Sequence, residues 1–184
     1  ITDISFEELM AIIDQHIKER KALSFTRLTL KMFLKSFFNT KLREAINLID
    51  IVVPSSKILY RFIKKTYPDY QPRLEEIKEM MVPLMREYHP FLVHFLILGG
   101  SHLGLNHLTI NLKASFPELK IIGAYPKIFL ERNPDDVHTV IRKSEPHVFF
   151  IGLGQGKEEM WYQENKNLIP KTVTICVDQQ IDRM

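Results

Sequence analysis

The sequence predicts an α/β fold, a doubly wound and mainly parallel sheet with helices on both faces. The strand candidates are apolar along their whole length, which is typical of parallel strands covered on both faces. Single helices separate most of these strands, as the crossover between parallel strands requires. Glycines stand at or directly after the ends of two of the strands, at positions 99, 100, 152 and 154. Such Rossmann-like sheets bind ligands beyond the carboxyl ends of their strands.

Length and composition are those of one globular α/β domain. The chain has 184 residues, of which 45% are hydrophobic and 26% charged, so disordered, collagen-like and low-complexity proteins are excluded. A single cysteine excludes a scaffold built on internal disulfides. The longest apolar run, residues 91–98, is far shorter than the roughly 20 residues of a spanning helix. The start of the chain does not resemble a signal peptide, so we expect a cytoplasmic protein, with a peripheral position at the inner membrane face as the further option.

In the first half of the chain, apolar spacing predicts five helices and two strands. Ser5 and Glu8 have the S-x-x-E spacing of a capping box, so the first helix begins after Ser5 and continues through Ile17. Pro83 should kink the last of these helices or mark a new start. The predicted strands are 22–26 and 50–53, and the further helices are 30–38, 41–49, 57–65 and 74–88.

The second half alternates more regularly between strand and helix. Proline and glycine mark most of the boundaries, as they do between the elements of βαβ units. The predicted strands are 94–98, 119–124, 147–153 and 173–177, and the predicted helices are 104–116, 134–144 and 158–165.

Positive charge is concentrated between Lys18 and Lys65. This segment holds twelve Lys and Arg residues against three acidic ones, while the whole chain has a net charge of +3. It predicts contact with an anionic membrane surface or an acidic protein partner, unless these residues are only solvated helix faces. Nucleic acid is disfavoured, because the sequence has no zinc-finger spacing, no RNP aromatic motif and no helix-turn-helix pattern.

Two glycine loops are candidates for chemistry. Gly99 and Gly100 end a strand before a helix, a layout that suits either a bound phosphate or a tight turn. After the strand that ends at Gly152, Lys157 and Glu158 stand where a ligand at the sheet edge would lie, or else begin a solvated helix. The carboxyl ends of parallel strands share one edge, so we expect four glycines to line one cleft. They are Gly99, Gly100, Gly152 and Gly154.

Other reactive residues form no recognisable site. The histidines at 102 and 107 are five residues apart and do not share a helix face, so we expect no metal ion and no cofactor. Cys176 lies within an apolar strand, which favours a buried, inert thiol over a nucleophile. Pro54-Ser55-Ser56 follows a strand and is either a helix cap or a loop of the site.

Six blocks of the second half have the order and spacing of one known family. They are Leu98-Gly99-Gly100, Phe116-Pro117-Glu118-Leu119-Lys120-Ile121-Ile122-Gly123, Lys127-Ile128-Phe129, Ile141-Arg142-Lys143-Ser144-Glu145-Pro146-His147, Ile151-Gly152-Leu153-Gly154-Gln155-Gly156-Lys157-Glu158-Glu159-Met160-Trp161 and Cys176-Val177-Asp178-Gln179-Gln180-Ile181-Asp182. The block from Leu42 to Pro54 matches more weakly. On these motifs the chain resembles the WecG/TagA/CpsF family of glycosyltransferases over almost its whole length.

The resemblance implies a bacterial cell-envelope enzyme. Members move an N-acetylhexosamine from a UDP-sugar to an acceptor linked to polyprenyl diphosphate. It also implies one domain, 1–184, with an acceptor-side half (1–90) and a nucleotide-sugar-side half (91–184). The positions that match the family's substrate-binding motifs are Thr26, Arg73, Gly99, Gly100, Tyr125, Gly154, Lys157, Glu158, Glu159 and Asp182.

Several matched positions depart from the family pattern. Ser55 stands where the family has its proposed catalytic aspartate, and a serine hydroxyl cannot take a proton near neutral pH without a base of its own. Glu158 replaces a glutamine, and Asp178 with Gln179 replaces paired glycines. We therefore expect a catalytically degenerate domain that keeps the fold and serves as a binding or structural protein, alone or as a homo-oligomer. The alternative is an active glycosyltransferase.

Overall fold

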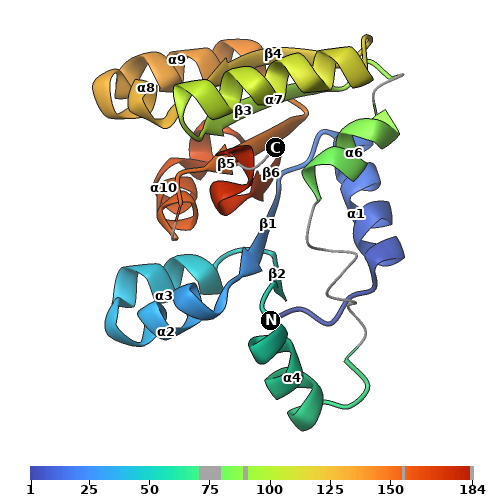
Figure 1. Cartoon of the computed structure of the whole chain (residues 1–184), viewed down its shortest axis with the longest axis vertical. Coiled ribbons are helices and arrows are strands. Elements are labelled where there is room, and N and C mark those ends of the chain that lie inside the picture. Colours follow the sequence, from blue (N-terminus) through green and yellow to red (C-terminus); the bar gives the residue numbers. More distant parts are fainter. Residues whose placement is uncertain (71–79, 89–90, 155, 183–184) are drawn as a thin grey trace.

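The computed structural model describes residues 1–70, 80–88, 91–154 and 156–182, which contain one six-stranded sheet (Figure 1). Its order is β2-β1-β6-β5-β3-β4, and all five strand pairings are parallel. The predicted doubly wound parallel sheet is thus confirmed. The strands are β1 (Leu23–Leu28), β2 (Ile51–Pro54), β3 (His94–Gly99), β4 (Lys120–Tyr125), β5 (Val148–Gly152) and β6 (Val173–Cys176).

Helices connect the strands and cover both faces of the sheet (Figure 1). In the first half they are α1 (Phe6–Glu19), α2 (Leu30–Phe38), α3 (Thr40–Asn47), α4 (Lys57–Thr66) and α6 (Met81–Tyr88). In the second half they are α7 (His102–Ser115), α8 (Lys127–Arg132), α9 (Pro134–Ser144) and α10 (Lys157–Asn165), with short 3-10 turns η1 (Lys166–Leu168) and η2 (Asp178–Asp182). The capping box predicted for α1 is present, because the Glu8 N–H donates to Ser5 Oγ while the Ser5 N–H donates to Glu8 Oε2.

Successive strand residues enter two different cores, one on each face of the sheet. In β3, Phe95 and Ile97 belong to the core that contains buried residues of α1, α6 and α7, whereas Leu96 and Leu98 belong to the core that contains buried residues of α2, α3, α4, α9 and α10. Alternating side chains of a strand point to opposite faces, so both sets must be apolar to be buried. This requirement explains why the strands are continuous apolar runs in the sequence.

The predicted elements are present, with ends that shift by a few residues. β1 continues to Leu28, because its last residues pair with β2. The sequence does not predict α8, which has only six residues between Pro126 and Asn133 and is too short to show an apolar stripe. Residues 74–79 of the predicted helix 74–88 lie outside the described residues. Pro83 falls in the first turn of α6, where its missing N–H leaves no helical hydrogen bond unmade.

The strand order places the switch point of the fold near the middle of the sheet. The chain runs outward from β1 to β2 and, on the other side, outward from β3 to β4, while β6 and β5 fill the centre. In doubly wound sheets the crevice for a ligand lies beyond the carboxyl ends at such a point. Residues 1–90 contribute β1 and β2, and residues 91–184 contribute the other four strands. The assignment of these halves to acceptor and donor stays a prediction.

Because β3 and β5 approach closely at their carboxyl ends, we predict that replacing Gly99 destabilises the folded protein. Gly99 has a φ of 135°, and a Cβ built there would lie 2.2 Å from the carbonyl oxygen of Gly152. We expect Gly99→Ala to lower the free energy of unfolding by roughly 2–6 kcal/mol, from backbone strain together with overpacking. Urea denaturation measures the loss.

Gly123→Ala is the matched control for this experiment. Gly123 lies in neighbouring β4 without a positive φ, and a Cβ there would meet the movable side-chain ends of Tyr125 and Leu96. Equal stability losses in the two variants would contradict the special role of Gly99.

Candidate functional site

The candidate site lies beyond the carboxyl ends of the four central strands, β1, β6, β5 and β3. Thr26 of β1 pairs with Cys176 of β6, which in turn pairs with Ile151 of β5. At the next position along, Gly99 of β3 pairs with Gly152 of β5. The tertiary structure thus brings residues that are up to 150 positions apart in the sequence to one edge of the sheet.

The two glycine loops are neighbours, as the shared sheet edge predicts. The Gly100 N–H donates to the carbonyl oxygen of Gly152 at 3.0 Å, and Gly154 and Gly156 have positive φ angles of 87° and 85°. The turn η2 packs directly on this bare backbone, since a Cβ on Gly100 would lie 2.5 Å from the Ile181 side chain. The glycines therefore make room for the chain's own C-terminal turn. That they also line a ligand cleft stays a prediction.

Asp182 lies at the amino end of α7. Its Oδ1 accepts hydrogen bonds from the Ser101 N–H and the Ser101 hydroxyl, both at 2.7 Å, and Ser101 Oγ in turn accepts from the Gly104 N–H at 3.1 Å. The first turn of a helix offers unpaired N–H groups and a partial positive charge, which attract a phosphate or a carboxylate. Here the chain's own carboxylate occupies the place that the glycine loop suggested for a phosphate. The role of Ser101 as the N-cap is not among the sequence predictions, although its spacing to Gly104 fits a cap.

A buried acid pair, Glu158 and Glu159, is the most unusual feature of the site. Both side chains are in the first turn of α10 and are 1% exposed. The Thr26 hydroxyl donates a hydrogen bond to Glu159 Oε1. Both oxygens of Glu158 and the second oxygen of Glu159 are buried and have no hydrogen-bond partner among the residues that the structure describes. Burial without full hydrogen bonding strongly disfavours the charged form of a carboxyl group.

The electrostatic environment of the acid pair favours its protonated form. Desolvation raises the pKa of Glu158 well above its ordinary value, and the neighbouring charges of Glu159 and Asp178 raise it further, while the backbone groups of Glu158 and Gly154 oppose the shift. Desolvation also raises the pKa of Glu159, an effect that the Thr26 hydrogen bond opposes and Asp178 reinforces. Because two adjacent buried carboxyls cannot easily both ionise, ionisation of either one opposes ionisation of the other.

Cys176 lies beside this pair and is buried, as predicted. Burial raises the pKa of its thiol, and the nearby carboxyls of Glu159 and Glu158 raise it further. A thiol in such surroundings stays protonated and is a poor nucleophile. The expectation of an inert thiol agrees with this environment.

The other predicted site residues are spread along the same edge or beyond it. Ser55 follows β2, and its N–H donates to the carbonyl oxygen of Leu28 at 2.9 Å. Four strand spacings separate Ser55 from Gly100, a distance of roughly 19 Å, so one small group cannot contact both. Tyr125 ends the edge strand β4 and stacks on Phe129 with 5.0 Å between the ring centroids.

Lys157 and Glu158 do not share the exposed position that the sequence suggested. Lys157 is exposed at the start of α10, whereas Glu158 is buried beneath it. The adjacent glycine turn lets the helix begin deep in the molecule, and sequence spacing alone does not reveal this depth. Arg73, which matches the family pattern, lies outside the described residues.

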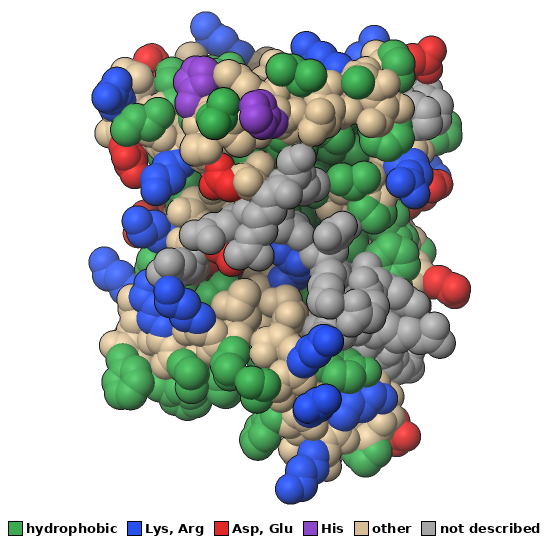
Figure 2. Space-filling view, in the orientation of Figure 1, with side chains coloured by type: hydrophobic (Ala, Val, Ile, Leu, Met, Phe, Trp, Pro, Cys, Tyr) green, Lys and Arg blue, Asp and Glu red, His purple; other side chains and the backbone are tan. Residues whose placement is uncertain are grey.

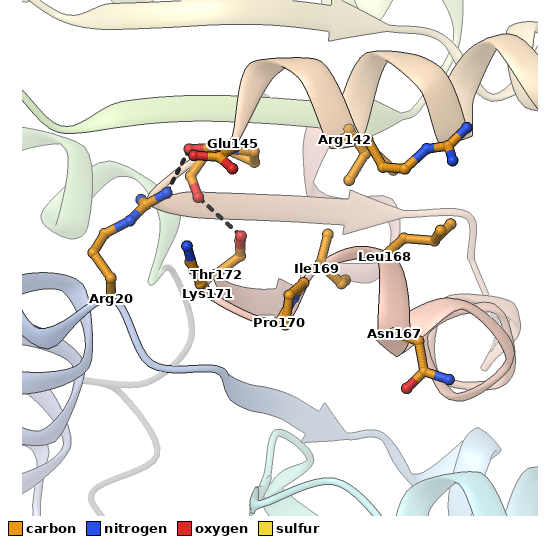
Figure 3. Close-up of a pocket in the computed structure, with 11 residues that line it drawn as sticks. Arg20, Arg142, Glu145, Asn167, Leu168, Ile169, Pro170, Lys171 and Thr172 are labelled. Carbon is orange, nitrogen blue, oxygen red and sulfur yellow. Dashed lines mark hydrogen bonds between the residues drawn. The ribbon is translucent and has the colours of Figure 1, made fainter.

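A separate pocket opens at the opposite, amino-terminal edge of the sheet (Figure 3). It has a volume of about 380 Å³ and is lined by residues that precede β1, β5 and β6, among them Arg20, Glu145 and Thr172. Arg20 Nη2 donates to the carbonyl oxygen of Glu145 at 2.8 Å, and Thr172 Oγ1 donates to that of Pro146 at 2.9 Å. Because parallel strands end at the other edge, this pocket is distinct from the candidate site.

Among the described residues, no helix has the length and apolarity needed to cross a bilayer. The same residues contain no cluster of three or more His, Cys, Asp or Glu side chains arranged to hold a metal ion.

The acid pair predicts an unusual dependence of stability on pH. A raised pKa means that the folded protein keeps a proton that the unfolded chain releases above about pH 4.5. The free energy of unfolding should therefore fall as the pH rises from about 4.5 through neutrality, by at most roughly 1.4 kcal/mol per pH unit for each carboxyl. Glu158→Gln with Glu159→Gln should remove this part of the slope in urea titrations at a series of pH values.

Glu164→Gln is the control, because Glu164 is exposed on the same helix α10. It should leave the pH profile as it is in the wild type. If the wild type and the double variant have the same slope, the pair is ionised in the folded protein and the prediction is wrong.

Comparison with known proteins agrees with the motifs and the fold. The model of the Glycosyl transferase WecG/TagA/CpsF family matches residues 1–184, the whole chain. The comparison with curated proteins gives no match. The six-stranded parallel sheet is the kind of fold that the resemblance implied. The chain belongs to the WecG/TagA/CpsF family of glycosyltransferases.

Proposed function

We propose that this chain is a glycosyltransferase-family domain that keeps the fold but has lost sugar transfer, and that it works as a binding or structural protein. The observation that carries the proposal is that the acid pair at the carboxyl edge is buried. The family's aspartate position is Ser55, and the nearby carboxyls of Glu158 and Glu159 are 1% exposed. A general base must come within hydrogen-bond reach of the proton that it removes. Neither buried carboxyl meets this requirement in this conformation.

The amino end of α7 supports the same proposal. A diphosphate bound after β3 would compete with Asp182, whose carboxylate already accepts two hydrogen bonds from Ser101. The Ile181 side chain packs against Gly100 and leaves no room there even for a Cβ. Close approach of a second anion would also be opposed by the charge of Asp182.

An active transferase is the second candidate, and one observation favours it. Glu159 is linked through Thr26 to the end of β1, and the loop that contains Ser55 is hydrogen-bonded to Leu28 at the end of the same strand. A carboxyl group with a raised pKa is suited to general-base catalysis near neutral pH. If the chain is an active transferase, a movement of the carboxyl edge exposes Glu159 to the acceptor hydroxyl. The donor is then a UDP-N-acetylhexosamine, and the product serves a bacterial cell envelope.

Substitution of Ser55 distinguishes the two candidates. We expect no release of UDP by the wild type above background when it is given UDP-N-acetylglucosamine or UDP-N-acetylmannosamine with a polyprenyl-diphosphate-linked acceptor. If loss of the base is the main defect, Ser55→Asp should increase the rate about 10²–10⁴-fold, which is the usual contribution of a positioned general base.

Ser55→Asn is the matched control, because it has the shape of aspartate without a basic oxygen. It should stay as inactive as the wild type. Turnover by the wild type at an ordinary enzymatic rate would overturn the proposal and favour the active transferase. Calorimetry with UDP and the same sugars reports donor binding independently of transfer.

A further inference from the structure

Two helices at the β2 end of the molecule expose apolar side chains where a globular protein normally has polar ones. On α2, Leu34, Phe37 and Phe38 are exposed, and Phe38 is 94% exposed. They have the i, i+3, i+4 spacing of one helix face, and it lies opposite the buried side chain of Met32. A surface helix normally directs such a stripe toward the core. The part of the chain that the structure describes therefore leaves the stripe on α2 largely uncovered.

The helix α4 repeats this arrangement. Ile58 and Phe62, 64% and 66% exposed, lie one turn apart, while Leu59 and Ile63 are buried in the core. Three basic residues, Lys57, Arg61 and Lys65, have the same i, i+4 spacing and flank the apolar stripe. Around this helix, a core face, an exposed apolar stripe and a basic stripe follow one another.

Both helices and the intervening α3 pack on the same face of the sheet. Buried residues of α2, α3 and α4 belong to one core, as Met32, Leu42 and Leu59 illustrate. Figure 2 shows apolar side chains gathered along the lower edge over α2 and α3, with Lys and Arg side chains beside them over α4. We call this region the α2–α4 surface. Its exposed apolar residues are Leu34, Phe37, Phe38, Leu48, Ile58 and Phe62.

The same surface is strongly basic. Residues 29–67 contain eight Lys and Arg against two acids, Glu44 and Asp50. This net positive charge disfavours a dimer of two copies through the α2–α4 surface, because like charges repel each other. It favours a partner that is anionic and also accepts apolar side chains.

We propose that the α2–α4 surface docks on an anionic lipid bilayer. Helices with aromatic and aliphatic side chains beside Lys and Arg insert their apolar groups to the depth of the headgroups while the cations bind anionic lipids. A fluid bilayer accepts apolar side chains from two separate helices without a matching shape. A folded acidic protein would need complementary pockets for each of them. The proposal stands on this surface alone and holds whether or not the chain transfers sugar.

Docking in this way fixes the orientation of the molecule. The loop that contains Ser55 directly precedes α4, so the β2 end of the carboxyl edge lies next to the bilayer. The fourth strand, β4, is at the far edge of the sheet and points away from the lipid. A lipid-linked molecule would thus reach Ser55 before the other candidate site residues that the structure describes.

Co-sedimentation with vesicles tests the proposal. We expect the wild-type protein to bind vesicles of phosphatidylcholine with phosphatidylglycerol at low salt and not to bind pure phosphatidylcholine. Charge reversal at Lys31, Arg61 and Lys65 should weaken binding about tenfold or more, since each cation near an anionic surface contributes to the attraction. At about 1 M salt, where the Debye length is about 3 Å, binding should weaken strongly.

Apolar substitutions separate insertion from simple charge attraction. Phe38→Ser with Phe62→Ser should weaken binding about tenfold while leaving the basic residues in place. A Phe38→Trp variant should give a blue-shifted fluorescence component on anionic vesicles that the wild type, with only Trp161, does not show.

Matched controls come from the opposite face of the sheet. Leu103 and Ile110 on α7 are 66% and 64% exposed, and Lys113 and Lys120 are also exposed. Leu103→Ser with Ile110→Ser, and Lys113→Glu with Lys120→Glu, should bind vesicles like the wild type. All variants are compared at equal helicity by circular dichroism, so that unfolding is not mistaken for lost binding.

Three results would overturn the proposal. The first is a wild type that stays in the supernatant with anionic vesicles at low salt. The second is an equal loss of binding in the α7 controls. The third is a change of oligomeric state in sedimentation equilibrium, or binding to an acidic protein, that depends on Phe38 and Phe62 while vesicle binding does not.

Discussion

The burial of the central strands on both faces is the constraint on which the rest of the structure depends. β6, β5 and β3 each have neighbours on both sides and are covered above and below, so their side chains enter either of two cores. Parallel pairing forces each connection to return across the sheet, and all strands therefore end at one edge. The residues at that edge therefore determine which ligands and which chemistry the centre of the molecule can accommodate.

At this edge the chain packs its own side chains against the glycine loops and the start of α7. Ile181 packs on Gly100, Asp182 accepts hydrogen bonds from Ser101 at the start of α7, and the acid pair is buried under the first turn of α10. Burying the acid pair costs folding free energy, because three of its four oxygens have no hydrogen-bond partner among the described residues. Buried polar groups without partners are rare, and such costs cluster at functional sites.

The centre and the periphery of the molecule differ in character. At the centre, close packing and proton-holding carboxyls leave little accessible chemistry in this conformation. At the β2 end, the α2–α4 surface exposes apolar side chains to water beside basic ones, and this exposure of the apolar side chains does not stabilise the fold. A domain that has drifted from catalysis can keep an interaction surface, because a site and a docking surface are made of different residues and lose function independently.

The sequence by itself determined the fold class, the family and most element boundaries. These properties are encoded locally, in continuous apolar strands, in caps such as Ser5 with Glu8, and in motif blocks with fixed spacing. It also located the concentration of positive charge, which depends on composition alone. Six residues of α8 escaped detection because so short a helix has no periodicity to detect.

Only the tertiary structure decided the depth of each site residue. Lys157 and Glu158 are adjacent in the sequence, yet one is exposed and the other buried, because the Gly156 turn sets the direction in which α10 enters the molecule. The link from Thr26 to Glu159 joins residues 133 positions apart, and no local pattern encodes it. The exposed face of α2 was hidden in the same way, since an apolar stripe in a sequence shows which residues share a face but not whether a core lies beneath it. Burial depends on what packs against each face, and that is a property of the whole fold.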